Sequence, residues 1–224
     1  QLLAEYDQLA RSIFLDMFED QNEITIEKLL NNKTLILHKD GNHGGNYPRK
    51  EEFDSEGIPF LSAKNINDQG QFDYSNVEFL NFNKARKLTI GWLKKDDVLL
   101  SHNASVGKVT RYNGFFEEAL IGTSLTCFRT DKTLLNPYYL QYHLMSPFFY
   151  RQLEKIMSQS TRNQVPITAQ RKLKLIVPNI NMQNQFAEKI ALIEQQKELA
   201  KQELQESEDL FQALLQNAFK GELI

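Results

Sequence analysis

Neighbouring carboxylates are the residues best suited to acid–base chemistry in this sequence, and they include Asp96-Asp97 and Glu117-Glu118. In a strand, two adjacent side chains point to opposite faces, so neither pair is expected to share one reacting group. The polar stretch 39–50 contains glycines and many hydrogen-bond donors, but no Gly-Lys-Ser/Thr sequence closes it as a phosphate-binding loop. We therefore interpret residues 39–50 as a turn-rich loop that presents donors.

The sequence Asn-Pro-Tyr-Tyr at 136–139 differs by one residue from the Asn-Pro-Pro-Tyr motif of DNA amino-methyltransferases. That motif needs a glycine-rich cofactor loop, and no Gly-x-Gly occurs in the 224 residues. Asn136 as a helix N-cap, with Pro137 at the first helical position, explains these residues better. Four separated histidines and the single Cys127 give no metal-ligand spacing, and no nucleophile elbow is present. The sequence therefore predicts binding without catalysis, with no metal, zinc included, and no cofactor.

Charge is divided along the chain, although the net charge is only −3. Residues 1–20 hold one basic and five acidic side chains, residues 21–181 hold 21 basic and 16 acidic, and residues 182–224 hold four basic and eight acidic. The central part thus carries +5 and each end carries −4. We interpret this division as a weak indication that the central part binds a polyanion.

A long helix is predicted over 182–220, because no Pro or Gly interrupts that stretch. Asn181 is its predicted N-cap and Gly221 its predicted C-cap. At about 1.5 Å per residue, the helix would be a rod on the order of 57 Å long. Its apolar residues recur in steps of three and four, as in a coiled-coil seam that Lys197 and Ser207 interrupt, and they are Phe186, Ile190, Ile193, Ala200, Leu204, Phe211, Leu214 and Ala218. An ordinary amphipathic helix lying on the body is the alternative.

Residues 2–18 have the apolar spacing of a second, shorter helix. With an offset of 201 residues, its apolar side chains Leu9, Ile13, Phe14 and Phe18 match Leu210, Leu214, Leu215 and Phe219. We interpret the match as an internal repeat of about two hundred residues. Because both helices join the same body, the short helix should lie antiparallel on about residues 184–202 of the long one.

Short, mixed periodicity between residues 21 and 181 predicts a small, mostly antiparallel β-sheet with flanking helices. Strands are predicted at 58–66, 97–101, 107–112, 124–129 and 172–178. Helices are predicted over about 26–30, capped by Thr25, and over 136–157. The predicted fold class is therefore α+β, with a long C-terminal coiled-coil helix paired with the shorter N-terminal helix.

Composition bounds the class of protein. Apolar residues make up 41% of the chain, which is enough for a core. No run of eighteen apolar residues and no signal-peptide pattern is present, and Cys127 fits a small, buried strand residue. We expect a soluble protein of the reducing cytoplasm that does not enter a membrane.

Five phrases, in order along the whole chain, carry a resemblance to a known family: residues 9–18 (LARSIFLDMF), 57–66 (GIPFLSAKNI), 100–109 (LSHNASVGKV), 166–178 (PITAQRKLKLIVP) and 210–223 (LFQALLQNAFKGEL). With them the chain resembles the specificity subunits of type I restriction-modification enzymes. Members of that family hold two target-recognition domains, each followed by a conserved helix, and the two helices pair antiparallel as a spacer. This sequence differs in having one such unit.

The resemblance implies that residues 21–181 form one target-recognition domain, similar in fold to the recognition domain of an adenine methyltransferase. That domain would read one half of a bipartite site in double-stranded DNA. Residues 1–20 would be the end of a preceding conserved spacer helix, and residues 182–224 the following conserved coiled-coil spacer helix. The implied subunit is non-catalytic, needs no cofactor, and recruits methyltransferase (modification) subunits and a restriction (motor) subunit in bacterial defence.

DNA-contacting loops vary with the site read in this family, so the candidate contacts are chosen from side-chain chemistry. Side chains on the predicted polar loops suit base edges and phosphates, and they are Asn42, His43, Asn46, Arg49, Lys64, Asn65, His102, Asn103, Ser105, Thr161, Arg162, Asn163 and Gln164. Basic side chains from the segment 83–95 either contact phosphates or form a solvated helix face, and they are Lys84, Arg86, Lys87 and Lys94.

Two alternatives stay open: a recognition module of a single-chain restriction-methylation enzyme, and a helical dimerisation or adaptor protein that does not bind DNA. If the short helix covers only the first half of the long one, the second half exposes an apolar stripe. We therefore expect either a fragment of a two-domain chain or a half-subunit that self-associates through residues 203–220. The predicted partner-helix residues are Phe186, Ile190, Ile193, Leu204, Phe211, Leu214, Leu215 and Phe219.

Overall fold

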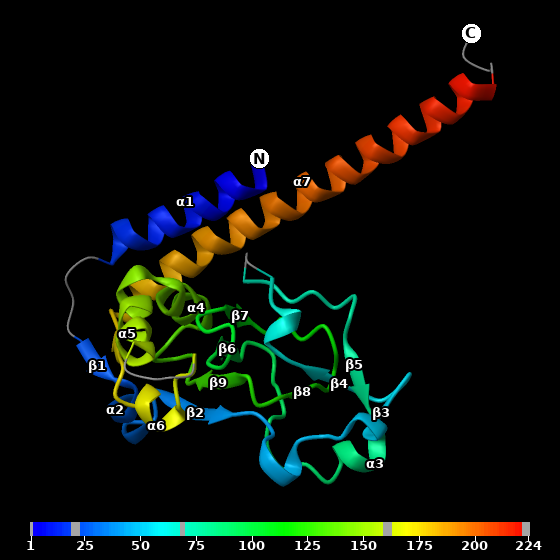
Figure 1. Cartoon of the computed structure of the whole chain (residues 1–224). Helices are drawn as coiled ribbons and strands as arrows, with labels where there is room; N and C mark the ends of the chain where they lie inside the picture. Colours follow the sequence, from blue (N-terminus) through cyan, green and yellow to red (C-terminus); the bar gives the residue numbers. More distant parts are fainter. Residues whose placement is uncertain (1, 19–22, 68–69, 159–162, 221–224) are drawn as a thin grey trace.

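A computed structural model places a mixed body of strands and helices beneath two helices that run side by side (Figure 1). The structure describes residues 2–18, 23–67, 70–158 and 163–220. α1 (Leu2–Met17) and α7 (Ile180–Lys220) form the helical pair, and α7 continues well beyond α1 and the body. None of the described helices is long and apolar enough to cross a membrane. The predicted α+β fold, with a long C-terminal and a shorter N-terminal helix, is confirmed.

The first sheet is antiparallel and contains, in spatial order, β2 (Leu35–Asp40), β9 (Leu125–Thr130), β6 (Val98–Ser101) and β7 (Val109–Arg111). Three of these strands were predicted, whereas β2 was not, because its polar end runs into the loop at 39–50. Alternate residues of β6 face two apolar clusters, since Val98 and Leu100 pack toward the helices and Leu99 packs away from them. The sheet is therefore covered on both faces.

The second sheet contains, in spatial order, β3 (Phe53–Asp54), β5 (Glu78–Leu80), β4 (Ile58–Leu61) and β8 (Leu120–Ile121). Among the strands that the structure describes, β4 and β8 are the one parallel pair, so the sheets are mostly antiparallel, as predicted. The strand predicted at 58–66 ends at Leu61, because the chain turns into a 3-10 helix (Ala63–Asn65). α3 (Phe82–Ala85), capped by the Asn81 side chain, and two further 3-10 turns (Gly44–Asn46 and Lys50–Glu52) lie near this sheet.

A two-stranded ribbon brings the two ends of the body together. β1 (Glu23–Thr25) pairs antiparallel with β10 (Lys174–Ile176), a shorter version of the strand predicted at 172–178. α2 (Ile26–Asn31) follows β1, and the Thr25 side chain accepts its Lys28 N–H as predicted. α6 (Ile167–Gln170) precedes β10. Because β1 follows α1 and β10 precedes α7, the ribbon holds the body ends of both helices in one place (Figure 1).

The single helix predicted over 136–157 is wrong, because the structure divides it into α4 (Pro137–Met145) and α5 (Pro147–Met157). Pro147 has no N–H with which to continue α4. Ser146 is extended, with φ −69° and ψ 152°, and its side chain accepts the Phe149 N–H at 3.3 Å, which starts a new helix. Asn136 caps α4 as predicted, since its Oδ1 accepts the Tyr138 N–H at 2.9 Å.

α7 begins at Ile180 rather than at residue 182, so Asn181 is not its N-cap. Asn179 takes that role, because its side chain accepts the Asn181 N–H at 2.8 Å. The predicted C-cap, Gly221, lies outside the described residues. With 41 residues at about 1.5 Å each, α7 is on the order of 60 Å long.

α1 lies antiparallel on the first half of α7, as predicted: Met17 is beside Lys189 and Asp7 is beside Lys197. Lys197, predicted to interrupt the apolar seam, is 8% exposed and forms an ion pair with Asp7. Removing Asp7 would leave the buried ammonium group of Lys197 unpaired, so this pair favours the observed alignment of the two helices. Aromatic side chains from α1, α4, α7 and the residue after α1 meet in one cluster made of Phe14, Phe18, Tyr139, Tyr142 and Phe186.

The second half of α7 is not covered by the rest of the described structure. From residue 202 to residue 220 every side chain is exposed except that of Leu215, which is half-buried. The large apolar side chains there, which we call the distal stripe, are Leu204, Leu210, Phe211, Leu214 and Phe219. The predicted uncovered half is therefore present, and Phe219 is 89% exposed.

Gln183 fastens the start of α7 to the body. Its wholly buried side chain accepts the Asn136 N–H at 2.8 Å and donates to the carbonyl oxygens of Pro178 at 2.8 Å and Leu134 at 3.3 Å. The amide thus satisfies backbone groups at the end of the body that have no partner in a strand or helix.

Gln183→Ala should lower the free energy of unfolding by about 2–4 kcal/mol, because each buried backbone group left without a partner costs about 1–3 kcal/mol. Gln185→Ala, at an exposed position on the same helix, should change it by less than about 0.5 kcal/mol. Urea unfolding followed by circular dichroism compares the two variants. Equal stabilities would show that the Gln183 amide does not fasten the helix.

Candidate nucleic-acid interface

Five loop segments meet at one edge of the body, where β2, β4 and β6 end and where β8 joins β9. We call this surface the polar loop edge; it consists of residues 41–49, 62–65, 102–107, 122–124 and 163–165. The first segment is held by its backbone, since the Gly41 N–H donates to the Leu125 carbonyl at 3.0 Å. A Cβ at Gly41 would lie 2.3 Å from the Gly122 oxygen, so glycine is required for this close approach.

The other segments of the polar loop edge are also held by hydrogen bonds between loops. The His102 N–H donates to the Ser124 carbonyl at 3.0 Å, and the Ser124 hydroxyl accepts the Ala63 N–H at 3.1 Å. The Ala104 N–H donates to the Asn163 carbonyl at 3.0 Å, and the Asn163 amide donates to the Ala104 carbonyl at 2.6 Å. Because these bonds fix the backbone, exposed side chains on the loops remain available to a ligand.

Three of the predicted contact residues lie inside the fold. Asn42 is wholly buried and its amide donates to the Ile90 carbonyl at 3.0 Å. Asn65 is 3% exposed, and its side-chain oxygen accepts the Ser62 N–H at 3.0 Å. His102 is also buried. These side chains shape the loops, so we remove them from the predicted contact set.

The remaining predicted residues differ in their surroundings. Lys64 is exposed but pairs with Glu78 at 2.6 Å. Thr161 and Arg162 lie outside the described residues. The predicted side chains that the polar loop edge presents exposed or half-buried are His43, Asn46, Arg49, Asn103, Ser105, Asn163 and Gln164.

The predicted cation cluster is partly neutralised by carboxylates. Lys84 pairs with Glu52 at 3.1 Å. Arg86 donates to both carboxylate oxygens of Glu118, at 2.7 and 2.6 Å, and this guanidinium lowers the pKa of the Glu118 carboxyl. Lys87 and Lys94 are exposed and form no ion pair with any residue that the structure describes.

A chain of buried side-chain hydrogen bonds supports the loops from below. His38 Nε2 lies 3.1 Å from Gln170 Oε1, which can only accept, so Nε2 carries the proton. Gln170 donates to the Thr126 hydroxyl at 3.0 Å and to the Val165 carbonyl at 2.9 Å. The Thr126 hydroxyl lies 2.8 Å from His102 Nδ1 and forms a hydrogen bond with it. This network joins β2, β9 and α6 to two segments of the polar loop edge.

Sequence reasoning missed this network. The strand-internal polar residues His38 and Thr126 were its only signal, and β2 was not predicted as a strand. Gln170 belongs to a one-turn helix that was read as part of a family phrase, with no role of its own. Burial lowers the pKa of His38 to about 4 and also lowers that of His102, so both imidazoles are neutral at pH 7.

The carboxylates of Asp96 and Asp97 and the thiol of Cys127 have structural roles. Asp97 accepts two bonds from Arg129, at 2.7 and 2.6 Å, and Asp96 pairs with Arg111 and Lys132. Cys127 is buried, and burial raises the pKa of its thiol. Among the residues that the structure describes, no group of three or more His, Cys, Asp or Glu is placed to hold a metal ion.

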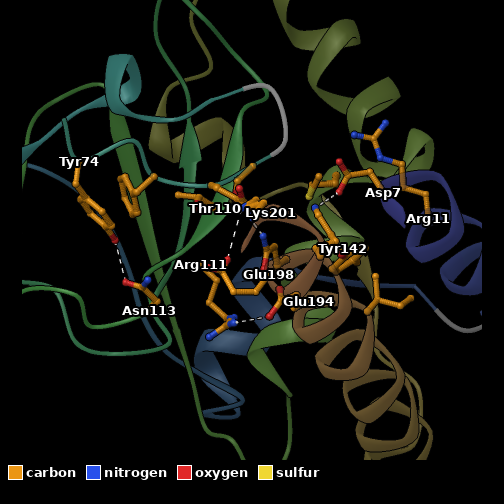
Figure 2. A pocket seen from close by; sticks show the side chains of 17 residues that line it. Asp7, Arg11, Tyr74, Thr110, Arg111, Asn113, Tyr142, Glu194, Glu198 and Lys201 are labelled. Carbon is orange, nitrogen blue, oxygen red and sulfur yellow. Dashed lines mark hydrogen bonds and ion pairs between the residues drawn. The ribbon is translucent and has the colours of Figure 1, made fainter. Parts of the chain in front are cut away.

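A polar cavity of about 340 Å³ lies between the helical pair and the body (Figure 2). Arg111 of β7 connects the body to α7. It forms ion pairs with Asp96 at 2.7 Å and with Glu194 of α7 at 3.5 Å. Its guanidinium lies 3.6 Å from the centre of the Tyr138 ring. Side chains of both signs line the cavity, including Asp7, Arg11, Glu198 and Lys201 (Figure 2). This balance of charges does not favour binding of a polyanion. We therefore assign the cavity to the contact between the helical pair and the body, and not to the candidate nucleic-acid interface.

The buried His38 should make stability depend on pH. Folded His38 takes up its proton near pH 4, against 6.5 when unfolded, so the unfolded state binds more protons between these values. Its contribution to stability is complete above about pH 6.5 and is lost as the pH falls toward 4. Between pH 7 and pH 5 this loss is about 2 kcal/mol. Urea unfolding at pH 7 and pH 5 measures this loss of unfolding free energy. The loss should be smaller for His38→Gln and the same as in the wild type for the exposed control His43→Gln. An equal loss in all three proteins would contradict the assignment.

Comparison with known proteins places the chain among sequence-specificity proteins. The family model of the "Type I restriction modification DNA specificity domain" matches residues 36–208. A curated relative, the putative type I restriction enzyme MjaX specificity subunit of Methanocaldococcus jannaschii, is 30% identical over 143 residues. That match covers 62% of this chain and 33% of the relative.

Solved structures share the fold at low sequence identity. The HsdS subunit of Thermoanaerobacter tengcongensis has a TM-score of 0.58 at 18% identity, covering 99% of this chain and 52% of that chain. The type I restriction-modification S subunit of M. genitalium has a TM-score of 0.58 at 17% identity, covering 96% and 52%. The chain thus spans about half the length of these solved chains and about a third of the curated relative. Because the family model matches well over half of the residues of this chain, the chain belongs to the family of type I restriction-modification DNA specificity domains.

Proposed function

We propose that this chain is a non-catalytic module that reads one half of a bipartite sequence in double-stranded DNA for a type I restriction-modification enzyme. The observation that carries the proposal is the polar loop edge, where five segments distant in sequence meet and three of them, 41–49, 102–107 and 163–165, present side chains suited to base edges. Loops held on a rigid sheet are the usual place for such recognition. Membership of the DNA specificity domain family supports the same function.

Side-chain chemistry suggests a division of roles on the polar loop edge. Arg49 can donate to both acceptors of a guanine edge, whereas the amides of Asn46 and Gln164 can bond to an adenine edge. Lys87 and Lys94, which lie outside the polar loop edge, form no ion pair with a described residue, so they are suited to phosphates. Lys64, Lys84 and Arg86 would first have to leave carboxylate partners, so we assign them no contact.

The three parts of the chain have separate roles in this proposal. Residues 21–181 form the target-recognition domain, residues 1–20 correspond to the end of a preceding spacer helix, and residues 182–224 form the following spacer helix, which structurally starts at Ile180. The spacer would carry the recognition domain at a fixed distance from a second one. Modification and restriction subunits, recruited to this assembly, would supply the catalysis, since Asp96, Asp97 and Glu118 of this chain are engaged in ion pairs.

The distal stripe indicates that a further helix pairs with α7. Exposed apolar side chains repeated along one helix are typical of a protein interface. In this proposal the partner is either the start of a preceding conserved helix in a longer chain or the same stripe of a second copy. Either partner would extend along the second half of α7 the helix pairing that α1 makes with its first half.

Replacing a base-reading residue should affect DNA binding differently from replacing a phosphate-contacting residue. Arg49→Gln should cost about 1–3 kcal/mol of binding free energy on the recognised sequence and relax the preference at one base pair. Lys87→Gln should weaken binding to every sequence and reduce the salt slope by about one. Fluorescence anisotropy with the recognised and randomised duplexes, at several KCl concentrations, measures both. If the wild-type chain binds no duplex even at low salt, the proposed function is wrong.

Charges placed in the distal stripe should prevent association. Phe211→Glu with Leu214→Glu should convert a dimer, or a complex with methyltransferase subunits, into the 26.1 kDa monomer, because burying two carboxylates in an apolar contact is unfavourable. Gln212→Glu with Gln216→Glu adds the same charge to the same part of α7 as a control. Sedimentation equilibrium measures the mass. A wild-type chain that is monomeric alone and when mixed with methyltransferase subunits would contradict the proposed interface.

A further inference from the structure

The positive charge of the body is concentrated in one stretch of sequence. Residues 151–174 contain six basic side chains and one acidic side chain, a net charge of +5. The body, residues 21–181, also carries +5 in total, from 21 basic and 16 acidic groups. The other residues of the body therefore balance at 15 basic against 15 acidic groups, and a polyanion would be attracted chiefly to this one stretch.

α5 and β10 bring basic side chains of this stretch onto one surface. Arg151 and Lys155 are exposed and four residues apart, so they lie on the same face of α5. The Gln152 side chain ties that helix to β10, donating to the Lys174 carbonyl at 3.0 Å and accepting the Lys174 N–H at 2.9 Å. A groove of about 510 Å³ results, lined by Arg151, Lys155 and Lys174 among others.

Along the chain, Arg171 and Lys172 lie between the polar loop edge and Lys174 of this groove. Both are exposed and directly follow α6, a single turn about 6 Å long. α6 begins next to Val165, whose N–H donates to the His102 carbonyl at 2.9 Å. The two cations thus lie about one helical turn along the chain from the loops that are proposed to read bases.

Four of the five cations have no carboxylate partner among the described residues. Arg151, Lys155, Arg171 and Lys172 form no ion pair with a described residue, whereas Lys174 pairs with Glu23 at 2.7 Å. In the cluster predicted from sequence, by contrast, Lys84 and Arg86 are neutralised by Glu52 and Glu118. An unpaired, exposed cation can bind a phosphate without first giving up an ion pair, so the free charge of the body lies mainly outside the predicted cluster.

We propose that Arg151, Lys155, Arg171 and Lys172, which we call the basic flank, bind the phosphate backbone of the DNA whose bases the polar loop edge reads. The proposal rests on the proposed function. A major groove about 12 Å wide is bordered by phosphates, so a surface that reads base edges needs cations beside it to fix its position on the duplex. The basic flank supplies them next to the segment that ends at Val165.

The test compares two double variants with a control of equal charge change. Arg151→Gln with Lys155→Gln, and Arg171→Gln with Lys172→Gln, each remove two positive charges from the basic flank. Lys189→Gln with Lys220→Gln removes two exposed positive charges from α7. Binding of each full-length chain to the recognised duplex and to a randomised duplex is followed by anisotropy between 50 and 200 mM KCl, and circular dichroism melting verifies the fold.

Each flank variant should lower the slope of log K against log salt by about 0.9 per lost contact, thus by about two, equally on both duplexes. The control should keep the wild-type slope. Flank variants that keep the wild-type slope while the wild-type chain binds DNA would overturn the basic flank and leave the proposed function standing. Such variants that instead lose assembly with methyltransferase subunits would show a protein-binding surface. Loss of preference at one base pair, with an unchanged slope, would make these residues base readers and also overturn the proposal.

Discussion

The apolar side chains in the first half of α7 must be buried against other elements, and this requirement arranges most of the chain. Phe186, Ile190 and Ile193 are buried against α4 and α1, and the aromatic cluster at Phe186 joins elements from both ends of the sequence. The ribbon of β1 and β10 returns both helices to the same side of the body. Lys197 favours their observed alignment through its ion pair with Asp7. Since α7 is longer than the body, the same requirement leaves the distal stripe to a partner.

A second constraint determines where recognition can occur. Strands β2, β4 and β6 end at one edge, so their loops must satisfy their backbone groups with one another. The network of His38, Gln170 and Thr126 provides a buried support beneath two of these loops. Their exposed side chains can then vary with the DNA sequence while the backbone stays in place. This separation of a fixed support from variable contacts suits a protein whose function is to discriminate sequences.

Ionic groups are distributed in a way that favours binding over catalysis. Asp97, Glu118 and Asp96 are held by arginine or lysine, so the described structure uses these carboxylates as supports. Exposed cations that form no ion pair with a described residue lie on α5 and directly after α6. The acidic α1 and α7 lie over the body next to α4 and α5 (Figure 1), and their net charge makes them poor contacts for phosphates. In the proposed function, this uneven distribution of charge would orient the molecule toward DNA.

The sequence by itself determined the long helix, the shorter helix antiparallel to it, the α+β body and the family, because three-to-four periodicity, caps such as Thr25 and whole phrases are local signals. It did not determine which polar residues face a ligand. Asn42, Asn65 and His102 looked like contacts but are buried, since burial depends on segments distant in sequence. It also did not reveal that Glu52 and Glu118 neutralise Lys84 and Arg86. Tertiary structure decided these points, because ion pairing and exposure are properties of neighbours in space, which a spacing pattern along the chain does not specify.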